Sequence, residues 1–142
     1  MLIVDTGPIL AQIEPADALA RGAARALAAE QTTPVMPLTV AAELDYMLVA
    51  RGGGSANRAL LRDLASGRFI VPGLEPEDFA TSQVLNERYR DFQVGLTDLS
   101  IVVLAARYRT TRILTFDQRH FRLMRPIQGG VFTLLPFDEP ST

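Results

Sequence analysis

Short apolar segments alternate with longer helical segments along the whole chain, and this alternation constrains the fold more than any other feature. Strand-like segments lie at residues 1–5, 34–38, 68–73, 112–117 and 131–136. Helices are predicted at 7–14, 15–30, 39–51, 55–67, 75–92 and 98–109. Strands that alternate with helices are typical of a parallel sheet covered on both faces, so we expect an α/β fold.

Local signals place the ends and faces of these helices. Asp5 or Thr6 is available to cap the first helix, and Thr97 to cap the helix at 98–109. The long helix at 75–92 is expected to bury one apolar face. This face comprises Phe79, Val84, Leu85 and either Tyr89 or Phe92.

Composition narrows the class of protein. The chain is 48% hydrophobic, which is typical of a globular protein, and we expect a single domain over residues 1–142. A net charge of −2 excludes a strongly basic nucleic-acid coat protein. Cysteine is absent, so disulfides and thiolate metal sites are excluded. No apolar run is long enough to span a membrane and no signal-like segment opens the chain, so a cytoplasmic location is expected.

Two of the predicted strands end on an aspartate. Asp5 follows the apolar run MLIV, and Asp117 follows RILTF. Ligands of an open parallel sheet bind beyond the carboxyl ends of its strands, so both side chains are expected at that edge. Asp98 begins the helix that leads into the fourth strand, and it joins them only if the preceding segment delivers that helix to the same edge. Each acid alone also fits a role as a helix cap or turn residue.

A fourth acid comes from the predicted helix at 39–51, which is apolar nearly all round. Glu43 and Asp45 both lie there, and a lone carboxylate buried in such a setting is unfavourable without a partner. Helical periodicity does not decide which of the two faces a site. Three or four converging carboxylates require a cation, and an all-oxygen ligand set suits Mg²⁺ or Mn²⁺ rather than Zn²⁺. Such a pocket can generate a hydroxide and stabilise charge on a scissile phosphate.

The segments MLIVDTGPIL, VAAELDYML, GLTDLSIVVLAARYRTTRILTFDQRHF and GGVFTLLP together resemble a PIN-domain ribonuclease. More narrowly, the chain is similar to the VapC-type toxins of bacterial toxin–antitoxin pairs, from Met1 to about Pro136. The resemblance implies a PIN-like three-layer α/β/α sandwich around a central, mostly parallel sheet of four to five short strands. It also implies an endoribonuclease that uses Mg²⁺ or Mn²⁺ to cut a loop of transfer or ribosomal RNA. Such a toxin is neutralised by a VapB-type antitoxin, and self-association as a homodimer is expected.

The same resemblance assigns roles to single residues. Asp5 and Asp98 are implied as metal ligands, and Asp117 as a ligand that binds directly or through water. Glu43, selected over Asp45, orients water or completes a second metal site. Thr6 takes the position of the family's small hydroxyl residue beside the substrate. The family's acidic quartet therefore falls on four positions of this chain: Asp5, Glu43, Asp98 and Asp117.

Residues around the fourth strand are further candidates. Arg119 follows Asp117 closely and either contacts an RNA phosphate or is a solvated surface arginine. Thr115 points to the same side of its strand as Asp117, where it bonds a carboxylate or fills space in the sheet. His120 is the only histidine, and we interpret it as packing and bonding locally rather than as a general acid.

Two other functions fit part of the pattern. A receiver-type or haloacid-dehalogenase-like phosphoryl-transfer domain also gathers acids around Mg²⁺ at the carboxyl ends of parallel strands. Such domains usually need a lysine there, and the chain has none; the phosphatase also needs a second acid where Gly7 stands. A catalytically inert PIN-like module that binds RNA or protein is the other alternative, although it has no need of the intact quartet.

Overall fold

The computed structural model describes residues 1–13, 16–51 and 54–139. The predicted helix end at Glu14, the helix start at Pro15 and the break at Gly52 and Gly53 lie outside the described residues. The strands are β1 (Ile3–Val4), β2 (Arg112–Leu114) and β3 (Thr133–Leu135). The helices are α1 (Thr6–Leu10), α2 (Ala18–Ala29), α3 (Leu38–Ala50), α4 (Gly54–Ala65), α5 (Pro76–Arg88), η1 (Arg90–Phe92), α6 (Leu96–Arg107) and α7 (Gln118–Leu123).

The sheet is parallel, as the alternation of strands and helices predicts. β2 lies in the middle, with β1 on one side and β3 on the other. Beyond β1 the sheet continues only as single bridges, from Ile3 to Val35 and from Val35 to Ile70. The expectation of four to five strands is therefore corrected to three strands and two bridged residues within the described ranges.

Proline explains why the two outer segments are so short. Pro34 and Pro37 flank Val35 and Met36, and Pro72 follows Ile70 and Val71. Because proline has no backbone N–H, it cannot donate to a sheet ladder, and pairing stops within a residue or two.

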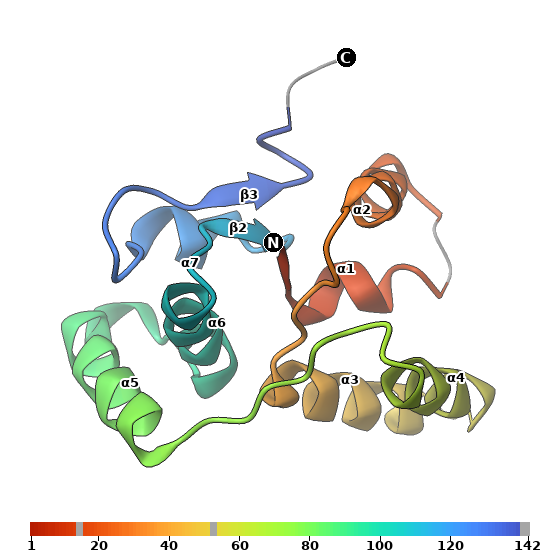
Figure 1. Cartoon of the computed structure of the whole chain (residues 1–142), viewed down its shortest axis with the longest axis horizontal. Coiled ribbons are helices and arrows are strands. Elements are labelled where there is room, and N and C mark those ends of the chain that lie inside the picture. Colours follow the sequence, from red (N-terminus) through yellow and green to blue (C-terminus); the bar gives the residue numbers. More distant parts are fainter. Residues whose placement is uncertain (14–15, 52–53, 140–142) are drawn as a thin grey trace.

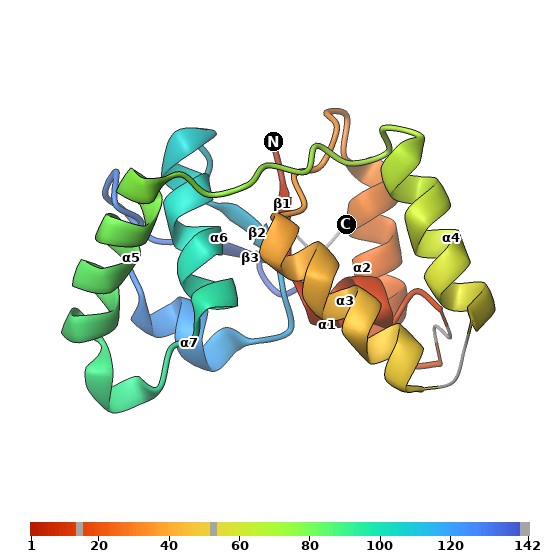
Figure 2. The ribbon, with the colours of Figure 1, turned by 90° about the horizontal axis from the view of Figure 1, so that it is seen from below.

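Helices cover both faces of the sheet, which confirms the expected three-layer α/β/α arrangement (Figure 1). α6 lies on one face, and its residues 99–105 are all buried. α2 lies on the other, where Gly22 comes so close to Pro136 that an added Cβ would stand 3.1 Å from the proline ring. α5 packs outside α6 (Figure 2).

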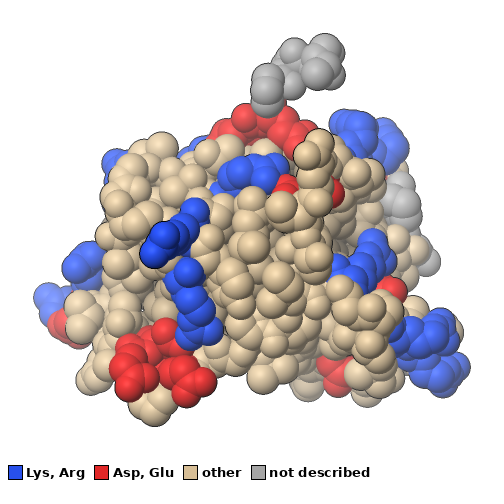
Figure 3. Space-filling model, in the orientation of Figure 1, with Lys and Arg blue, Asp and Glu red and all other residues tan. Residues whose placement is uncertain are grey.

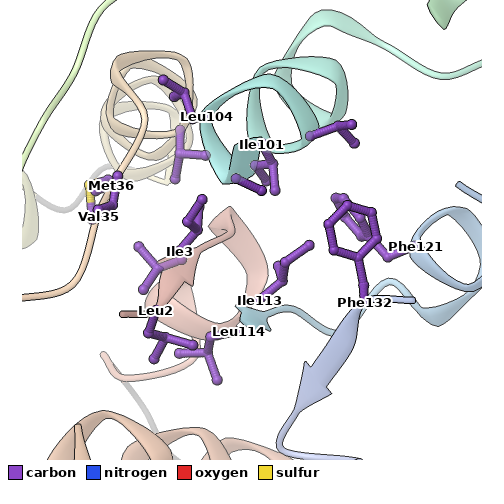
Figure 4. Close-up of a cluster of buried hydrophobic side chains, with 14 of the residues drawn as sticks. Leu2, Ile3, Val35, Met36, Ile101, Leu104, Ile113, Leu114, Phe121 and Phe132 are labelled. Carbon is purple, nitrogen blue, oxygen red and sulfur yellow. The ribbon is translucent and has the colours of Figure 1, made fainter. Parts of the chain in front are cut away.

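Apolar side chains from both faces of the sheet form the core. Figure 4 shows Ile101 and Leu104 of α6 facing Ile3 and Ile113, whereas Leu2 and Leu114 point to the opposite side. These residues are 0% exposed. The alternation of inward directions along such short strands follows from the two-residue period of a strand.

Most helix boundaries shift by up to three residues from the expectation, and the largest differences are three. α1 ends at Leu10 rather than reaching residue 14. The helix expected at 75–92 ends at Arg88, and the separate turn η1 follows. α7 was not expected; it forms because the side chain of Asp117 accepts a hydrogen bond from the backbone N–H of His120 and so caps a new helix.

The expected inner face of α5 is only partly correct. Leu85 and Tyr89 are buried, whereas Phe79 and Val84 are 48% and 59% exposed. The hydrophobic pattern of this helix is therefore spread around its circumference rather than confined to the face that meets α6. None of the helices in the described residues is long and apolar enough to cross a membrane.

Candidate active site

A pocket of about 590 Å³ opens at the carboxyl edge of the sheet. The chain that leaves β2 runs down to this edge between α1 and α3 on one side and α6 and α7 on the other (Figure 2). The parallel strands bring their carboxyl ends to one side, as expected for an open α/β sheet. All four predicted acids line the pocket: Asp5, Glu43, Asp98 and Asp117.

Asp5 is placed by the end of β1 and the start of α1. Its Oδ1 accepts a 2.8 Å hydrogen bond from the backbone N–H of Thr6, so it also caps α1. Its Oδ2 accepts a 2.7 Å hydrogen bond from the hydroxyl of Thr115. Thr115 is 0% exposed and is not among the residues that line the pocket, so its hydroxyl orients Asp5 from beneath.

Asp117 is held where β2 gives way to α7. Its backbone N–H donates to Thr115 Oγ1 at 3.0 Å, and its Oδ1 accepts from the backbone N–H of His120 at 3.0 Å. Its Oδ2 lies 2.7 Å from Nδ1 of the His120 ring. The helix-cap role and the site position are therefore compatible, because each uses a different oxygen of the same carboxylate.

Asp98 reaches the same edge because the chain before α6 is tied there. Gly95 caps α6, which puts Asp98 in its first turn. His120 connects the two segments, since its Nε2 lies 2.9 Å from the carbonyl oxygen of Phe92 and its Nδ1 lies 3.3 Å from Asp98 Oδ2. The segment before α6 therefore does bring Asp98 to the carboxyl edge of the sheet, as the prediction from the sequence required, through this contact between α7 and the turn η1.

The structure distinguishes Glu43 from Asp45. Glu43 lines the pocket and accepts a 3.0 Å hydrogen bond from the hydroxyl of Thr97. Asp45 accepts a hydrogen bond from the side chain of Asn57 and so joins α3 to α4. The expected capping role of Thr97 is wrong, because Gly95 takes that position and frees the Thr97 hydroxyl for Glu43.

Burial and repulsion between carboxylates raise the pKa of two of the acids. Burial, followed by the charges of Asp5 and Asp117, raises the pKa of Asp98 to about 6. Burial also raises the pKa of Asp5, although its hydrogen bonds to Thr115 and Thr6 act against that shift. Burial lowers the pKa of His120, but its contacts with Asp117 and the Phe92 carbonyl outweigh burial and the net shift is upward. The pocket thus carries an excess of negative charge.

The donor set fits a divalent cation. The pocket offers carboxylate oxygens from separate elements, and no lysine or arginine is among the residues that line it within the described ranges. Thr6 Oγ1 is buried and has no hydrogen-bond partner among those residues, although the threonine lines the pocket. An unpaired buried hydroxyl is unfavourable, and a bound ion with its water or a phosphate oxygen would satisfy it.

Arginines outside the pocket differ in their availability. Arg119 is exposed just beyond Asp117, and no acidic side chain of the described residues pairs with it. Arg122 is committed to Asp138 through two 2.7 Å contacts. Of these two arginines, Arg119 is therefore the one available for a phosphate chain. Figure 3 shows the opposite face of the molecule, at the amino ends of the strands, where acidic side chains gather over the start of α5.

Sequence reasoning missed two participants in this site. Thr97 was assigned to the helix cap, and His120 was not linked to Asp98. The motif T-D at 97–98 and the spacing of Asp117 and His120, three residues apart on one helical turn, were the available signals.

Comparison with known proteins adds the family. The family model for the PIN domain matches residues 2–125. A curated relative, Ribonuclease VapC26 of Mycobacterium tuberculosis (strain ATCC 25618 / H37Rv), is 36% identical over 135 residues, which cover 95% of this chain and 100% of the relative.

Solved structures share the fold at low sequence identity. VapC20 of Mycobacterium tuberculosis, described as a Sarcin-Ricin loop cleaving toxin, has a TM-score of 0.75 and 18% identity, covering 84% of this chain and 92% of its own. VapBC2 of Rickettsia felis, bound to a DNA fragment from their promoter, has a TM-score of 0.69 and 17% identity, covering 94% and 97%. A toxin-antitoxin complex from Klebsiella pneumoniae has a TM-score of 0.64 and 18% identity, covering 85% and 90%.

Proposed function

The chain belongs to the VapC group of the PIN-domain family, and from this premise we propose that it is a metal-dependent endoribonuclease toxin. The observation that carries the proposal is that Asp5, Glu43, Asp98 and Asp117 all line one pocket, whose lining contains no lysine or arginine among the described residues. The relative is named a ribonuclease, which supports hydrolysis of RNA as the reaction, and the four acids provide carboxylate oxygens for the metal ion.

Asp5, Asp98 and Asp117 would hold Mg²⁺ or Mn²⁺. When bound, such an ion supplies Lewis-acid stabilisation of phosphoryl charge and an acidified water. Thr115 keeps Asp5 in its orientation, and Thr97 keeps the Glu43 carboxylate directed into the pocket, where it orients or deprotonates the attacking water. The products would be a 5′-phosphate and a 3′-hydroxyl end.

The substrate that we propose is a structured RNA, in a loop of transfer or ribosomal RNA. VapC20 is described as a toxin that cleaves the Sarcin-Ricin loop. Arg119, exposed beside Asp117, would contact the phosphate chain as it enters the pocket, and the Thr6 hydroxyl would bond a phosphate oxygen.

A VapB-type antitoxin is the proposed protein partner, and the proposed location is the cytoplasm. Two of the solved neighbours are toxin–antitoxin assemblies. A mainly apolar hollow of about 300 Å³ between α1, α2, α3 and α4, lined by Ile9, Leu44, Leu60 and Phe69 among others, suits the apolar side of an antitoxin segment. Exposed Leu38, Tyr46 and Val49 along α3 favour self-association as a homodimer.

The experiment that tests the activity is cleavage of total cellular RNA by purified, antitoxin-free protein, with new ends mapped by sequencing. Cuts are expected with Mg²⁺ or Mn²⁺ and not with EDTA. Asp5→Asn and Asp98→Asn should abolish cutting while the far-ultraviolet circular dichroism spectrum stays unchanged. Cleavage by either variant at the parental rate would contradict the assignment of these acids.

The inert binding module is the second candidate, and one measurement separates it from the enzyme. Calorimetry that detects no Mn²⁺ binding to the isolated protein would favour inertness. The phosphoryl-transfer alternative finds no support in the site, because Gly7 rather than an acid lies in the pocket and no lysine exists in the chain.

A further inference from the structure

We propose that His120 Nδ1 is a direct ligand of the metal ion, together with Asp98 and Asp117, and that this nitrogen makes the site prefer Mn²⁺ to Mg²⁺. The inference rests on the proposed function, because it concerns the same pocket. It changes the expected all-oxygen ligand set into one with a nitrogen. The three ligand atoms, one from each residue, all lie within 4.8 Å of one another.

The hydrogen bond on the far side of the ring determines which nitrogen is free. His120 Nε2 lies 2.9 Å from the carbonyl oxygen of Phe92, and a carbonyl can only accept, so Nε2 carries the hydrogen. In the neutral ring Nδ1 then has a lone pair directed at the carboxylates. Metal-bound histidines usually have this arrangement, with the remote N–H donated to a carbonyl that fixes the ring.

The spacing of the three atoms suits a shared ion. Nδ1 lies 2.7 Å from Asp117 Oδ2 and 3.3 Å from Asp98 Oδ2. Neighbouring ligand atoms around an octahedral ion with bonds of about 2.1 Å are about 3 Å apart. All three atoms are acceptors when the ring is neutral, so the cluster needs either a second proton on the ring or a cation among them, and a bound metal ion takes the place of that proton.

A second observation points to a ligand in the same pocket. Thr6 Oγ1 is buried without a partner among the described residues, and Thr6 itself is 5% exposed. Thr6 is one of the residues that line the pocket, together with Asp98 and Asp117. The pocket beside the cluster therefore contains a buried hydroxyl without a hydrogen-bond partner among those residues, which a bound ligand would satisfy.

Ligand chemistry gives the preference between ions. Mg²⁺ prefers oxygen ligands and water, whereas an imidazole nitrogen favours first-row transition metals. Among these metals Mn²⁺ also accepts sites in which most ligands are oxygens, as they are here. The chain has a single histidine, no lysine and no cysteine, so an imidazole signal from a bound ion has only one source.

Two substitutions separate ligation from a merely structural role. His120→Gln removes Nδ1 and keeps an amide N–H that can reach the Phe92 carbonyl, whereas His120→Asn places an amide oxygen near the former Nδ1. Mn²⁺ and Mg²⁺ affinities are measured by calorimetry on the full chain. Pulsed electron paramagnetic resonance of the Mn²⁺-loaded protein reports a directly bound nitrogen. Unfolding midpoints in EDTA show whether each variant folds.

The expected result is a strong ¹⁴N coupling in the parent that disappears in both variants. Mn²⁺ affinity should fall by about tenfold or more in His120→Gln, whereas Mg²⁺ affinity should change by less than about threefold. An equal loss for both ions would overturn the inference, since it would show that His120 only shapes the pocket. The parental spectrum decides the matter even if both variants fail to fold. Mn²⁺ binding without ¹⁴N coupling overturns the inference alone, whereas the absence of Mn²⁺ binding overturns the proposed metal dependence as well.

Discussion

The hydroxyl of Thr115 donates a 2.7 Å hydrogen bond to Asp5 Oδ2, just beyond the ends of the neighbouring strands β2 and β1. The same hydroxyl oxygen accepts from the backbone N–H of Asp117 at 3.0 Å. One buried side chain thereby sets the positions of two acids that are 112 residues apart in the chain. The carboxyl edge of the sheet is pre-organised by a group that does not itself line the pocket.

Replacing this hydroxyl should weaken the metal site. Thr115→Val keeps the shape of the side chain but leaves the buried Asp5 carboxylate without its donor, so we expect Mn²⁺ affinity to fall by about tenfold or more. Unfolding in EDTA should become easier by about 1–2 kcal/mol. Calorimetry and urea unfolding measure the two effects, and Thr115→Ser should retain most of both. Parental affinity in Thr115→Val would show that Asp5 needs no support from the strand.

Asp98 should destabilise the metal-free fold at neutral pH. Its pKa is raised to about 6 from 3.8, mainly by burial, so the folded state retains a proton that the unfolded state has lost. The free energy of unfolding therefore falls as pH rises from about 4 to 6. We expect Asp98→Asn in EDTA to be more stable than the parent by about 1–3 kcal/mol at pH 7. The two should have similar stability near pH 3.5, as measured by urea unfolding.

A bound metal ion should reverse the order of stability of the parent and Asp98→Asn. Saturating Mn²⁺ should stabilise the parent, because the ion binds the folded state only, and it should stabilise Asp98→Asn much less. In the parent, Mn²⁺ affinity and cleavage should both decline below about pH 6, where Asp98 gains its proton. A parent that is insensitive to pH between 5 and 7 would contradict the link between this carboxylate and the ion.

Glu43 and Asp45 form a matched pair for testing the site. Glu43→Gln should lower the cleavage rate by about 100-fold or more, because the neutral amide cannot accept a proton from the attacking water. Asp45→Asn should cut RNA at close to the parental rate, since Asp45 faces Asn57 rather than the pocket. Single-turnover kinetics on a defined RNA compare them, and the reverse ranking would remove Glu43 from the site.

Glu30 should be a stability determinant rather than a functional residue. Its side chain is 4% exposed and lies 2.6 Å from Arg112 and 3.8 Å from the N-terminal ammonium. Burial raises its pKa, but hydrogen bonds from Thr32 and Arg112 outweigh burial and lower it. Glu30→Gln should reduce the free energy of unfolding at pH 7 by about 1–3 kcal/mol. The difference should disappear as pH falls through 4.5 and below, while RNA cleavage remains intact.

Arg119 should contribute to RNA affinity through charge. Arg119→Ala is expected to raise KM with little change in kcat and to reduce the slope of log affinity against log salt by about one. Arg119→Lys should restore the salt slope. If the alanine variant retains the parental slope, Arg119 is a solvated arginine, and phosphate contacts must come from other residues.

The position of the acids at the strand ends was accessible to sequence reasoning. MLIVD and RILTFD each contain an apolar run that ends on an aspartate. Parallel pairing of the two strands then brings Asp5 and Asp117 to the carboxyl edge of the sheet. The helix that begins near Asp98 was equally visible. The outer strands were not, because Pro34, Pro37 and Pro72 limit pairing to single residues whose partners lie far away in the chain.

The sequence by itself determined the order of elements, the parallel sheet and the acids beside it, since these depend on side-chain patterns a few residues long. Helical periodicity left Glu43 and Asp45 open and the family resemblance selected Glu43, but only the tertiary structure shows why Glu43 reaches the pocket. The two lie about 200° apart around α3, and the packing of that helix against α4 and α6 sets its rotation. It also decided that His120 meets Asp98, because that contact needs α7 and the turn at Phe92 to be side by side, and no local propensity encodes the distance between them.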